Sequence, residues 1–247
     1  MEDPYHAEVP LPFITGPYAV RLRTMTSQML KRSFDVIASS VGLLVFSPLL
    51  LAVAFWVRID SPGPIFYRGK RGGRNNVPFG IYKFRSMVMN ADRIGGSSTS
   101  GEDPRVTKSG RFIRRYKIDE LSQLINVLVG DMSLVGPRPE ITTYTDKYEG
   151  EFLEIMRVRP GITDWASIWN ADEGGVLAGA TDPDRAYEIL IQPTKLRLQL
   201  RYVRTQRFLT DIKIILYTLR RIIDADFYPR ELADIPPLKQ GEGACVA

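Results

Sequence analysis

One long apolar segment dominates the pattern of hydrophobic and polar positions along the chain. From residue 36 to residue 57, 22 consecutive residues carry no charge, and 17 of them are apolar. A helix of this length extends about 33 Å at ~1.5 Å per residue, close to the ~30 Å hydrocarbon core of a bilayer. The pattern predicts a helix embedded in a membrane, with a buried core helix and a plain signal anchor as the alternatives.

Two features of this segment favour a re-entrant hairpin, which enters the membrane and returns to the same side. Ser47 and Pro48 lie at its middle, where proline breaks or kinks a helix and a serine hydroxyl can relieve the freed backbone groups. Lys31 and Arg32 precede the segment and Arg58 follows it. Because positive charge marks the cytoplasmic side, both ends are expected there. A kinked spanning helix also tolerates proline and stays an alternative.

The chain up to the end of the apolar segment divides into two parts. Residues 1–17 are rich in proline, glycine and polar groups and are expected to form an irregular leader. Residues 18–58 are expected to form an amphipathic helix followed by the membrane anchor. The evidence for the amphipathic helix is that Val20, Met25 and Phe34 recur at loosely helical spacing among basic residues.

The pattern after the anchor predicts mixed structure that is mainly helical. Short β-prone stretches at 65–67 and 79–84, separated by glycines and asparagines, are typical of a small β-hairpin. Residues 92–110 are expected to form a loop. Helices are predicted at 118–128, 141–157 and 208–223, and others beginning at Pro183 and Pro193. The fold class is therefore α+β, predominantly helical, and the amphipathic last helix can lie on lipid or on the core.

Composition limits the chemistry of the chain. Of the 247 residues 44% are apolar, and 33 Lys+Arg against 28 Asp+Glu give a net charge of +5, which favours anionic partners. The single cysteine is Cys245 and the single histidine is His6. These counts exclude an intrachain disulfide, a cysteine-rich metal cluster, a Ser-His-Asp triad and a histidine-based zinc site. Catalysis would have to use carboxylates, Lys, Arg, hydroxyls or a hard metal ion.

The strongest candidate chemistry lies where a basic run meets two carboxylates. Between Asp103 and Asp119 there are six basic residues and no acidic one, and Asp119 and Glu120 then begin a predicted helix. Arginines hold diphosphate oxygens by forked hydrogen bonds. A carboxylate kept ionised by this field can attack phosphorus, with Mg²⁺ offsetting the repulsion between anions. The pattern favours phosphoryl transfer, although acidic residues are common at helix starts and a basic run is often a solvated face.

Several stretches carry a resemblance to a known family. Between about residues 29 and 165 the chain contains, in this order, KRSFDVIASSVGLLVFSPLLLAVA, YKFRSM, DPRVTKSGRFIRRYKIDELSQLINVLVGDMSLVGPRPE and RPGIT. They resemble the bacterial sugar transferases known as monotopic phosphoglycosyl transferases, in their compact form. The string VGDMSLVGPRP is highly specific for that family.

The resemblance implies transfer of a sugar 1-phosphate from a nucleotide diphosphate sugar, usually a UDP-sugar, to undecaprenyl phosphate, with release of UMP. It implies that Asp119 is the nucleophile, forms a phosphosugar-aspartyl intermediate and binds Mg²⁺, and that Glu120 is its catalytic partner. It also implies a helix break at Ser47-Pro48 and a catalytic domain over residues 59–247, at the cytoplasmic face of the bacterial inner membrane. The residues expected to bind phosphate or substrate are Lys83, Arg85, Arg105, Arg111, Arg114 and Arg138.

Two other functions stay open on the sequence. One is a non-catalytic, membrane-attached module that contacts acidic lipid or nucleic acid through residues 105–117, although no nucleic-acid-binding motif is present and no nucleic-acid partner is expected. The other is a phosphatase-like hydrolase that passes a group from Asp119 to water. After RPGIT the chain continues DWASIWNADEGG and departs from the GWAQVNGR that is frequent in the family. The sugar therefore stays open, as does assembly into a homo-oligomer.

Overall fold

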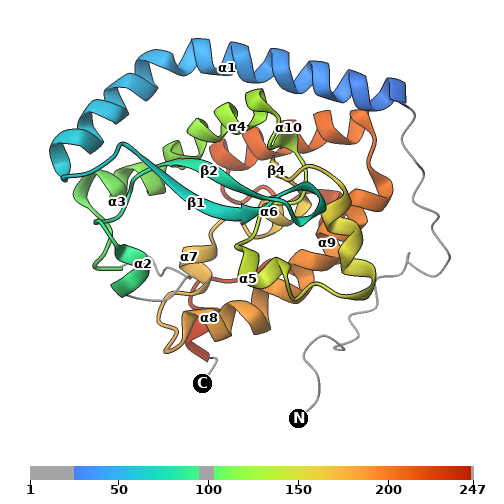
Figure 1. Cartoon of the computed structure of the whole chain (residues 1–247). Helices are drawn as coiled ribbons and strands as arrows, with labels where there is room; N and C mark the ends of the chain where they lie inside the picture. The colour runs from blue at the N-terminus through green and yellow to red at the C-terminus, as the bar shows by residue number, and fades with distance from the viewer. Residues whose placement is uncertain (1–24, 95–102, 246–247) are drawn as a thin grey trace.

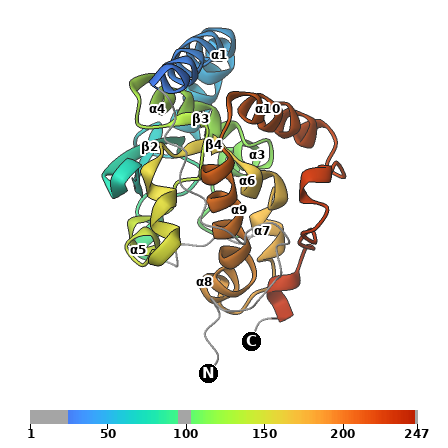
Figure 2. The same ribbon diagram turned by 90° about the vertical axis from the view of Figure 1, so that its right-hand side faces the viewer.

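The computed structural model describes residues 25–94 and 103–245, so the expected leader at 1–17 lies outside the described residues. The fold is predominantly helical with two small two-stranded sheets, which confirms the α+β class. Figures 1 and 2 show one long helix, α1, lying across one side of the molecule, with the remaining elements packed beneath it.

Helix α1 (Met25–Asp60) runs without interruption through Pro48 and includes the apolar segment. Of the amphipathic helix expected from residue 18, the part before residue 25 lies outside the described residues. The Ser47 hydroxyl donates to Leu44 O at 2.7 Å, one turn before the proline, and the helix arches along its length (Figure 1). Within the described part of the chain, α1 is the one helix long and apolar enough to cross a membrane. Only 11% of its most apolar window is buried, so α1 is not a core helix. The re-entrant path remains a prediction.

Polar contacts fasten the N-terminal half of α1 to the domain. Lys31 Nζ donates to Val135 O at 2.9 Å and to Asp211 Oδ2 at 2.8 Å. Asp35 Oδ1 accepts a hydrogen bond from Leu134 N at 3.1 Å. Both charged side chains are buried, so the helix is fixed in position at this end.

The C-terminal end of α1 is fastened by apolar packing. Val53 and Val57 are buried against Phe84 and Ile113. Large apolar side chains between the two fastened ends remain exposed. They include Ile37, Val41, Leu44, Val45, Phe46, Leu49, Leu51 and Phe55.

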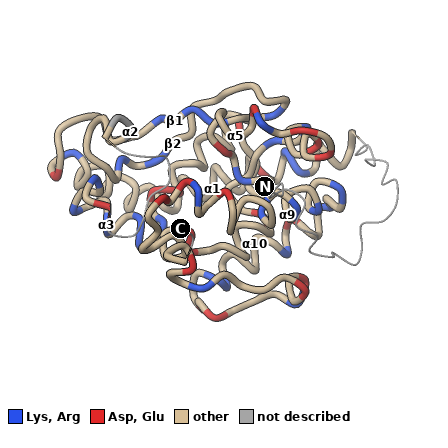
Figure 3. Tube along the Cα trace, turned by 90° about the horizontal axis from the view of Figure 1, so that it is seen from below, with Lys and Arg blue, Asp and Glu red and all other residues tan. Residues whose placement is uncertain are grey.

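The predicted hairpin is confirmed. Strands β1 (Phe66–Gly72) and β2 (Pro78–Phe84) are antiparallel, with Phe66 opposite Phe84 and Gly72 opposite Pro78. The turn between them includes Asn75 and Asn76 at φ 56° and 57°, a conformation that asparagine tolerates better than most residues. Figure 3 shows Lys and Arg positions along this hairpin and around α3.

The prediction of a loop over residues 92–110 is wrong at both ends of that range. Helix α2 (Ala91–Ile94) begins before it, and helix α3 (Lys108–Arg115) begins within it. Helix α3 forms because Thr107 caps it: the Thr107 side chain accepts a hydrogen bond from Gly110 N at 3.0 Å. Serine, threonine and glycine, which suggested a loop, here serve a helix start.

The helix predicted at 118–128 is confirmed, and its first half is a 3-10 helix. It comprises η3 (Ile118–Gln123) and α4 (Leu124–Val129), and Gly130 ends it in the left-handed conformation at φ 100°. Strand β3 (Ser133–Val135) follows and pairs in parallel with β4 (Gly161–Thr163).

The single helix expected at 141–157 is wrong. The chain forms α5 (Thr142–Thr145) and the 3-10 helix η4 (Gly150–Arg157) instead. Gly150 has φ 56°, which a continuous right-handed helix excludes. Helices α6 (Trp165–Trp169) and α7 (Glu173–Val176) follow β4.

The C-terminal third supplies most of the main core. Pro183 begins α8 (Pro183–Ala186), and the π-helical turn η5 (Tyr187–Ile191) leads into α9 (Gln192–Thr205) with Pro193 in its first turn, as the prolines predict. Helix α10 (Phe208–Ile223) is also confirmed. Core side chains from this part include Trp165, Ile168, Trp169, Leu198, Tyr202 and Ile214.

Helix α10 packs on the core, one of the two alternatives for the last predicted helix, and contact of its outer side with lipid stays a prediction. Ile214 and Asp211 are buried on its inner side, whereas Leu209, Leu219 and Ile223 are exposed on its outer side. The chain then forms two short 3-10 turns, Arg230–Leu232 and Glu242–Cys245.

Candidate active site

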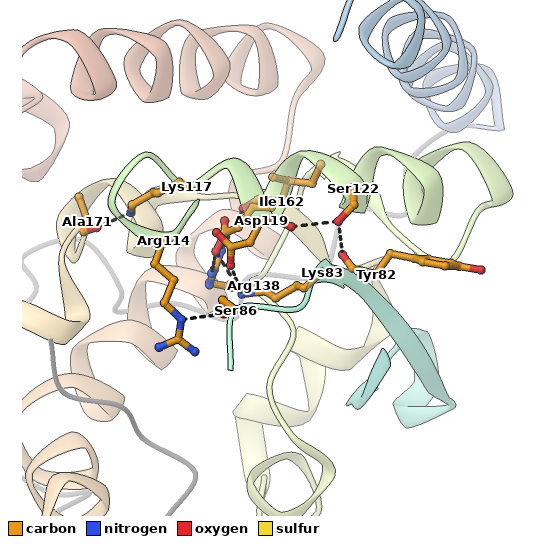
Figure 4. A network of polar contacts seen from close by, with 11 residues as sticks. Tyr82, Lys83, Ser86, Arg114, Lys117, Asp119, Ser122, Arg138, Ile162 and Ala171 are labelled. Carbon is orange, nitrogen blue, oxygen red and sulfur yellow. Dashed lines mark hydrogen bonds and ion pairs between the residues drawn. The ribbon is translucent and has the colours of Figure 1, made fainter. Parts of the chain in front are cut away.

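The two adjacent carboxylates lie at the start of η3, immediately after α3. Lys117 connects the two elements in the left-handed conformation, at φ 53°. Asp119 is 8% exposed and Glu120 is half-buried. The Ser122 hydroxyl lies 2.9 Å from Asp119 O and 3.0 Å from Tyr82 O, so it ties the start of η3 to β2 (Figure 4).

Two basic side chains from distant parts of the sequence converge on this carboxylate pair. Lys83, on β2, has its Nζ 3.3 Å from Glu120 Oε1 and 3.8 Å from Asp119 Oδ2. Arg138, in the turn after β3, donates from Nη1 to Glu120 Oε2 at 3.1 Å and from Nη2 to Glu120 Oε1. The structure therefore brings together Asp119, Glu120, Lys83 and Arg138. Figure 4 shows Asp119, Lys83 and Arg138 converging.

The two carboxylates have opposite electrostatic environments. Burial raises the pKa of Asp119 above its ordinary value; Lys83 opposes this shift, and the charge of Glu120 adds to it. Burial would also raise the pKa of Glu120, but Arg138 and Lys83 hold it well below its usual range. The sequence suggested that the nearby positive charges would keep Asp119 ionised. In the structure the loss of hydration has the larger effect on Asp119, and it raises the pKa. The positive charges of Arg138 and Lys83 act mainly on Glu120.

Arg114 lies beside the pair on α3. Its Nε donates to Ser86 Oγ at 2.8 Å. Burial lowers the pKa of the guanidinium, while the negative charges of Asp119 and Asp103 raise it. The two terminal nitrogens of Arg114 point away from Ser86 (Figure 4), so they are available for the oxygens of a phosphate.

The backbone of Arg138 is held from two sides. Its N–H donates to Asp164 Oδ2 at 3.2 Å, and its carbonyl accepts from Gln199 Nε2 at 3.2 Å. Pro137 and Pro139 flank Arg138. Each proline has a fixed φ, and Pro139 also restricts the backbone conformation of Arg138. The guanidinium therefore starts from a fixed backbone position.

Comparison with known proteins shows which family the chain belongs to. The family model for bacterial sugar transferases matches residues 26–225. The chain belongs to the bacterial sugar transferase family. The match covers α1, the carboxylate pair and every basic residue described above.

Curated members of the sugar transferase family include three informative relatives. The chain is 38% identical over 199 residues to a UDP-N-acetylgalactosamine-undecaprenyl-phosphate N-acetylgalactosaminephosphotransferase of Aeromonas hydrophila, covering 78% of this chain and 44% of the relative. It is 40% identical over 200 residues to the UDP-glucose:undecaprenyl-phosphate glucose-1-phosphate transferase of Escherichia coli K12, covering 78% and 40%. A protein of the same name from Caulobacter vibrioides is 37% identical over 199 residues, covering 79% of this chain and 70% of the relative. The chain thus spans less than half the length of the first two.

Three of the arginines assigned from the sequence are not drawn to the carboxylate pair in this sugar transferase. Arg85 Nη2 donates to Val57 O at 3.2 Å and to Ser61 O at 2.6 Å, so its guanidinium caps the C-terminal end of α1. Arg105 forms an ion pair with Asp103 at 2.6 Å. Arg111 is exposed on α3.

Sequence reasoning did not identify the residues that support Arg138. Glu140 is buried and pairs with Lys195 Nζ at 2.5 Å, and Tyr187 donates to the same carboxylate at 2.6 Å. With Gln199, this network joins the turn around Arg138 to α9 and η5. Tyr187, Lys195 and Gln199 lie more than 45 positions along the chain from this turn, and nothing in the local pattern distinguishes them from other polar residues.

Proposed function

We propose that this chain transfers a sugar 1-phosphate from a nucleotide diphosphate sugar, with UDP as the nucleotide, to undecaprenyl phosphate. The observation that supports this most is the carboxylate pair, Asp119 and Glu120, flanked by Lys83, Arg114 and Arg138. Relatives in the family carry names of that reaction on undecaprenyl phosphate. Two carboxylates beside three cations suit an attack by one of them on a phosphorus atom that carries several anionic oxygens.

The proposed first step is a displacement at the phosphorus that bears the sugar. An Asp119 oxygen forms a bond to this phosphorus, the bond to the bridging oxygen breaks, and UMP leaves with the electron pair. The sugar phosphate is then held on Asp119 as an acyl phosphate. Because burial raises the pKa of Asp119, its ionised oxygen is a stronger base, and hence a better nucleophile, than an exposed aspartate.

The second step returns the enzyme to its starting state. An oxygen of undecaprenyl phosphate forms a bond to the same phosphorus, the bond to Asp119 breaks, and the product is undecaprenyl-diphosphate-sugar. Glu120, kept ionised by Arg138 and Lys83, positions these two cations beside the phosphate groups. Arg114 binds the oxygens that gain charge as UMP leaves.

The residues at the site fit a magnesium ion. The described residues include no group of three or more His, Cys, Asp or Glu side chains that could hold a metal alone. Mg²⁺, however, usually takes one or two carboxylates together with substrate phosphates and water, and the buried Asp119 meets that requirement. Bound by Asp119 and the donor phosphates, the ion would supply charge neutralisation between the anions.

The attachment of α1 supports a re-entrant anchor at the cytoplasmic face. Lys31 in its first half and Val57 near its end both contact the same domain, so both ends of the helix lie on one side of a membrane that α1 enters. The exposed apolar side chains lie between these ends, around Ser47 and Pro48. The carboxylate pair then lies close to the headgroups, where the phosphate of undecaprenyl phosphate is found.

Isolation of the covalent intermediate tests the proposal. Purified protein in detergent with Mg²⁺ and UDP-sugar labelled in the sugar, but without lipid, should release UMP and retain label, and added undecaprenyl phosphate should remove the label into lipid. Asp119→Asn should abolish both labelling and turnover, whereas Asp131→Asn, an exposed aspartate after α4, should leave them unchanged.

Three outcomes would contradict the proposal. Label that persists in Asp119→Asn argues against the aspartyl intermediate. Label lost to water as free sugar phosphate indicates a hydrolase. Membrane binding that depends on salt but not on Asp119, without UMP release, indicates a non-catalytic basic module.

A further inference from the structure

The C-terminal residues 228–245 lie beyond the part of the chain that the family model matches, yet they are firmly packed. Leu232 is fully buried and Ile235 is 4% exposed, both in the main core. Figure 2 shows this segment descending along the side of α6 and α7. It ends against residues 169–177, which comprise the end of α6, the connection to α7 and α7 itself.

Three hydrogen bonds join these two segments. Trp169 Nε1 donates to Pro236 O at 2.9 Å. Gln240 Nε2 donates to Asp172 Oδ2 at 3.2 Å, and Gly241 N donates to Gly175 O at 2.9 Å. The contacts are spread over the length of residues 169–177, so the segment is held at several points.

Close backbone packing adds to these hydrogen bonds. Gly243 is buried, and a Cβ atom there would lie 3.0 Å from both Leu177 Cα and Val176 O. That separation is tighter than ordinary carbon contacts, and both neighbours are backbone atoms. Any side chain at residue 243 would therefore push the two segments apart.

Residues 169–177 also border the catalytic carboxylates. Lys117, two residues before Asp119, donates from Nζ to Ala171 O. Figure 4 shows Ala171 and Lys117 on the Arg114 side of the carboxylate pair. The capping residue of α6, Asp164, is the same residue that accepts the hydrogen bond from Arg138 N.

The charge of residues 169–177 suits one end of a nucleotide sugar. Asp172 and Glu173 are acidic and would repel a diphosphate. Carboxylates accept hydrogen bonds from hydroxyl and amide groups, which a neutral sugar carries in a stereospecific pattern. The diphosphate belongs at Lys83, Arg114 and Arg138, and the sugar beside residues 169–177.

We propose that residues 228–245 form a clasp that holds residues 169–177 as the sugar-facing wall of the donor site, and that this wall determines which donor sugar is accepted. The proposal rests on the transferase function proposed above. Residues of the clasp are positioning residues, because they act through the wall and do not touch the substrate themselves.

Substitutions within the full chain test the clasp. Gly243→Ala inserts a methyl group between the two segments, and Gln240→Ala removes one hydrogen bond with little change in packing. Lys239→Ala is the control, because Lys239 is an exposed residue of the same C-terminal segment. Hydrogen exchange of residues 169–177 reports whether the wall loosens. Steady-state kinetics with UDP-glucose, UDP-galactose and their N-acetyl amino forms report donor selection.

We expect Gly243→Ala to speed exchange across residues 169–177 and to raise the KM for the preferred donor on the order of tenfold. The differences in kcat/KM among the four donors should shrink, and the KM for undecaprenyl phosphate should stay within twofold. Gln240→Ala should have the same effects in weaker form, and Lys239→Ala should have none. A general loss of stability would instead affect donor and acceptor kinetics together.

Two results would overturn the inference. Unchanged exchange in Gly243→Ala means that residues 228–245 do not hold the wall. Faster exchange with an unchanged donor KM and donor ranking means that the wall does not meet the sugar. Hydrogen exchange is measured without turnover, so it tests the clasp even if the protein consumes no nucleotide sugar. A failure to consume any nucleotide sugar would count against the transferase function itself.

Discussion

Arg138 holds Glu120 through both terminal nitrogens of its guanidinium, with Nη1 donating to Oε2 at 3.1 Å and Nη2 donating to Oε1. This forked geometry cannot be reproduced by lysine, whose ammonium is a single point charge. Glu120 in turn raises the pKa of Arg138 against the effect of burial. Each residue therefore keeps the other charged next to the proposed nucleophile.

Arg138→Lys should retain the fold and lose most of the turnover. The positive charge remains, but one of the two hydrogen bonds to Glu120 is lost and the cation is no longer fixed for a phosphate oxygen. We expect UMP release to fall on the order of 10²–10³-fold. The control is Arg207→Lys, at an exposed position before α10, which should be neutral. Activity of Arg138→Lys within twofold of the wild type would show that the forked contact is unimportant.

The buried network behind Arg138 should make stability depend on pH in one direction. Burial would raise the pKa of Glu140, but Lys195 and Tyr187 outweigh this effect and lower it from 4.5. A carboxyl group with a lowered folded pKa stabilises the fold above its unfolded pKa, and this stabilisation is lost as the pH falls through the lower folded value. Its contribution is therefore complete at pH 7 and declines below about pH 4.5.

Glu140→Gln removes one partner of a buried ion pair and should lower the free energy of unfolding by about 3–5 kcal/mol at pH 7. Urea unfolding in detergent at pH 7, 5 and 4 measures the difference from the wild type, which should shrink at the lowest pH. Glu188→Gln, in the exposed pair with Lys147, should change stability by less than about 1 kcal/mol. A difference for Glu140→Gln that stays constant from pH 7 to pH 4 contradicts the role of its charge.

The parts of the fold predicted from sequence are those with a strong local pattern. The hairpin, the helix after Lys117 and α10 each contain the turn residues or the apolar periodicity that define them. Strands β3 and β4 have three residues each, too few to display alternation, and they pair only because tertiary packing brings them together. The break at Gly150 depends on a positive φ that the residue type permits but does not require.

The candidate site shows the same division. Asp119 and Glu120 stand out because they follow a basic run, and Arg138 was assigned through its family motif. Arg85 was assigned with Lys83 because both lie in YKFRSM, one of the stretches that carry the family resemblance. Strand β2 ends at Phe84, however, and Arg85 turns toward α1. Such a change of direction at a strand end leaves no signal in the local sequence.

The position of Arg85 leads to a prediction about stability and donor binding. Its Nη2 lies within hydrogen-bonding distance of Val57 O, Ser61 O and Ser61 Oγ, and hydrogen bonds to charged groups contribute about 1.5–3 kcal/mol. Arg85→Met should lower the free energy of unfolding by about this amount while the KM for the nucleotide sugar stays within twofold. Arg114→Met, tested beside it, should raise that KM. A large rise in donor KM for Arg85→Met would instead support the phosphate-binding role expected of Arg85 from the sequence.

The bend in α1 should determine the topology of the chain in the membrane. A straight helix of 36 residues extends about 54 Å at ~1.5 Å per residue, enough to cross a bilayer. Pro48 lies inside the continuous helix α1 and lacks a backbone donor, which favours a bend and a return to the same side. Reporters placed at residues 10 and 240 should both be cytoplasmic in the wild type. In Pro48→Leu the backbone donor is restored, and part of the population should carry the residue 10 reporter on the opposite side.

The contacts of Lys31 and Val57 with the domain oppose this change, because a helix that spans the bilayer must give up one of them. Molecules with the altered topology should therefore lose the Lys31–Asp211 ion pair and unfold more easily in urea. Ser40→Ala is the matched control, since Ser40 is exposed on the same helix and its loss leaves the bend intact. Reporters on opposite sides in the wild type, or an unchanged distribution in Pro48→Leu, would contradict the re-entrant anchor or the role of the proline, respectively.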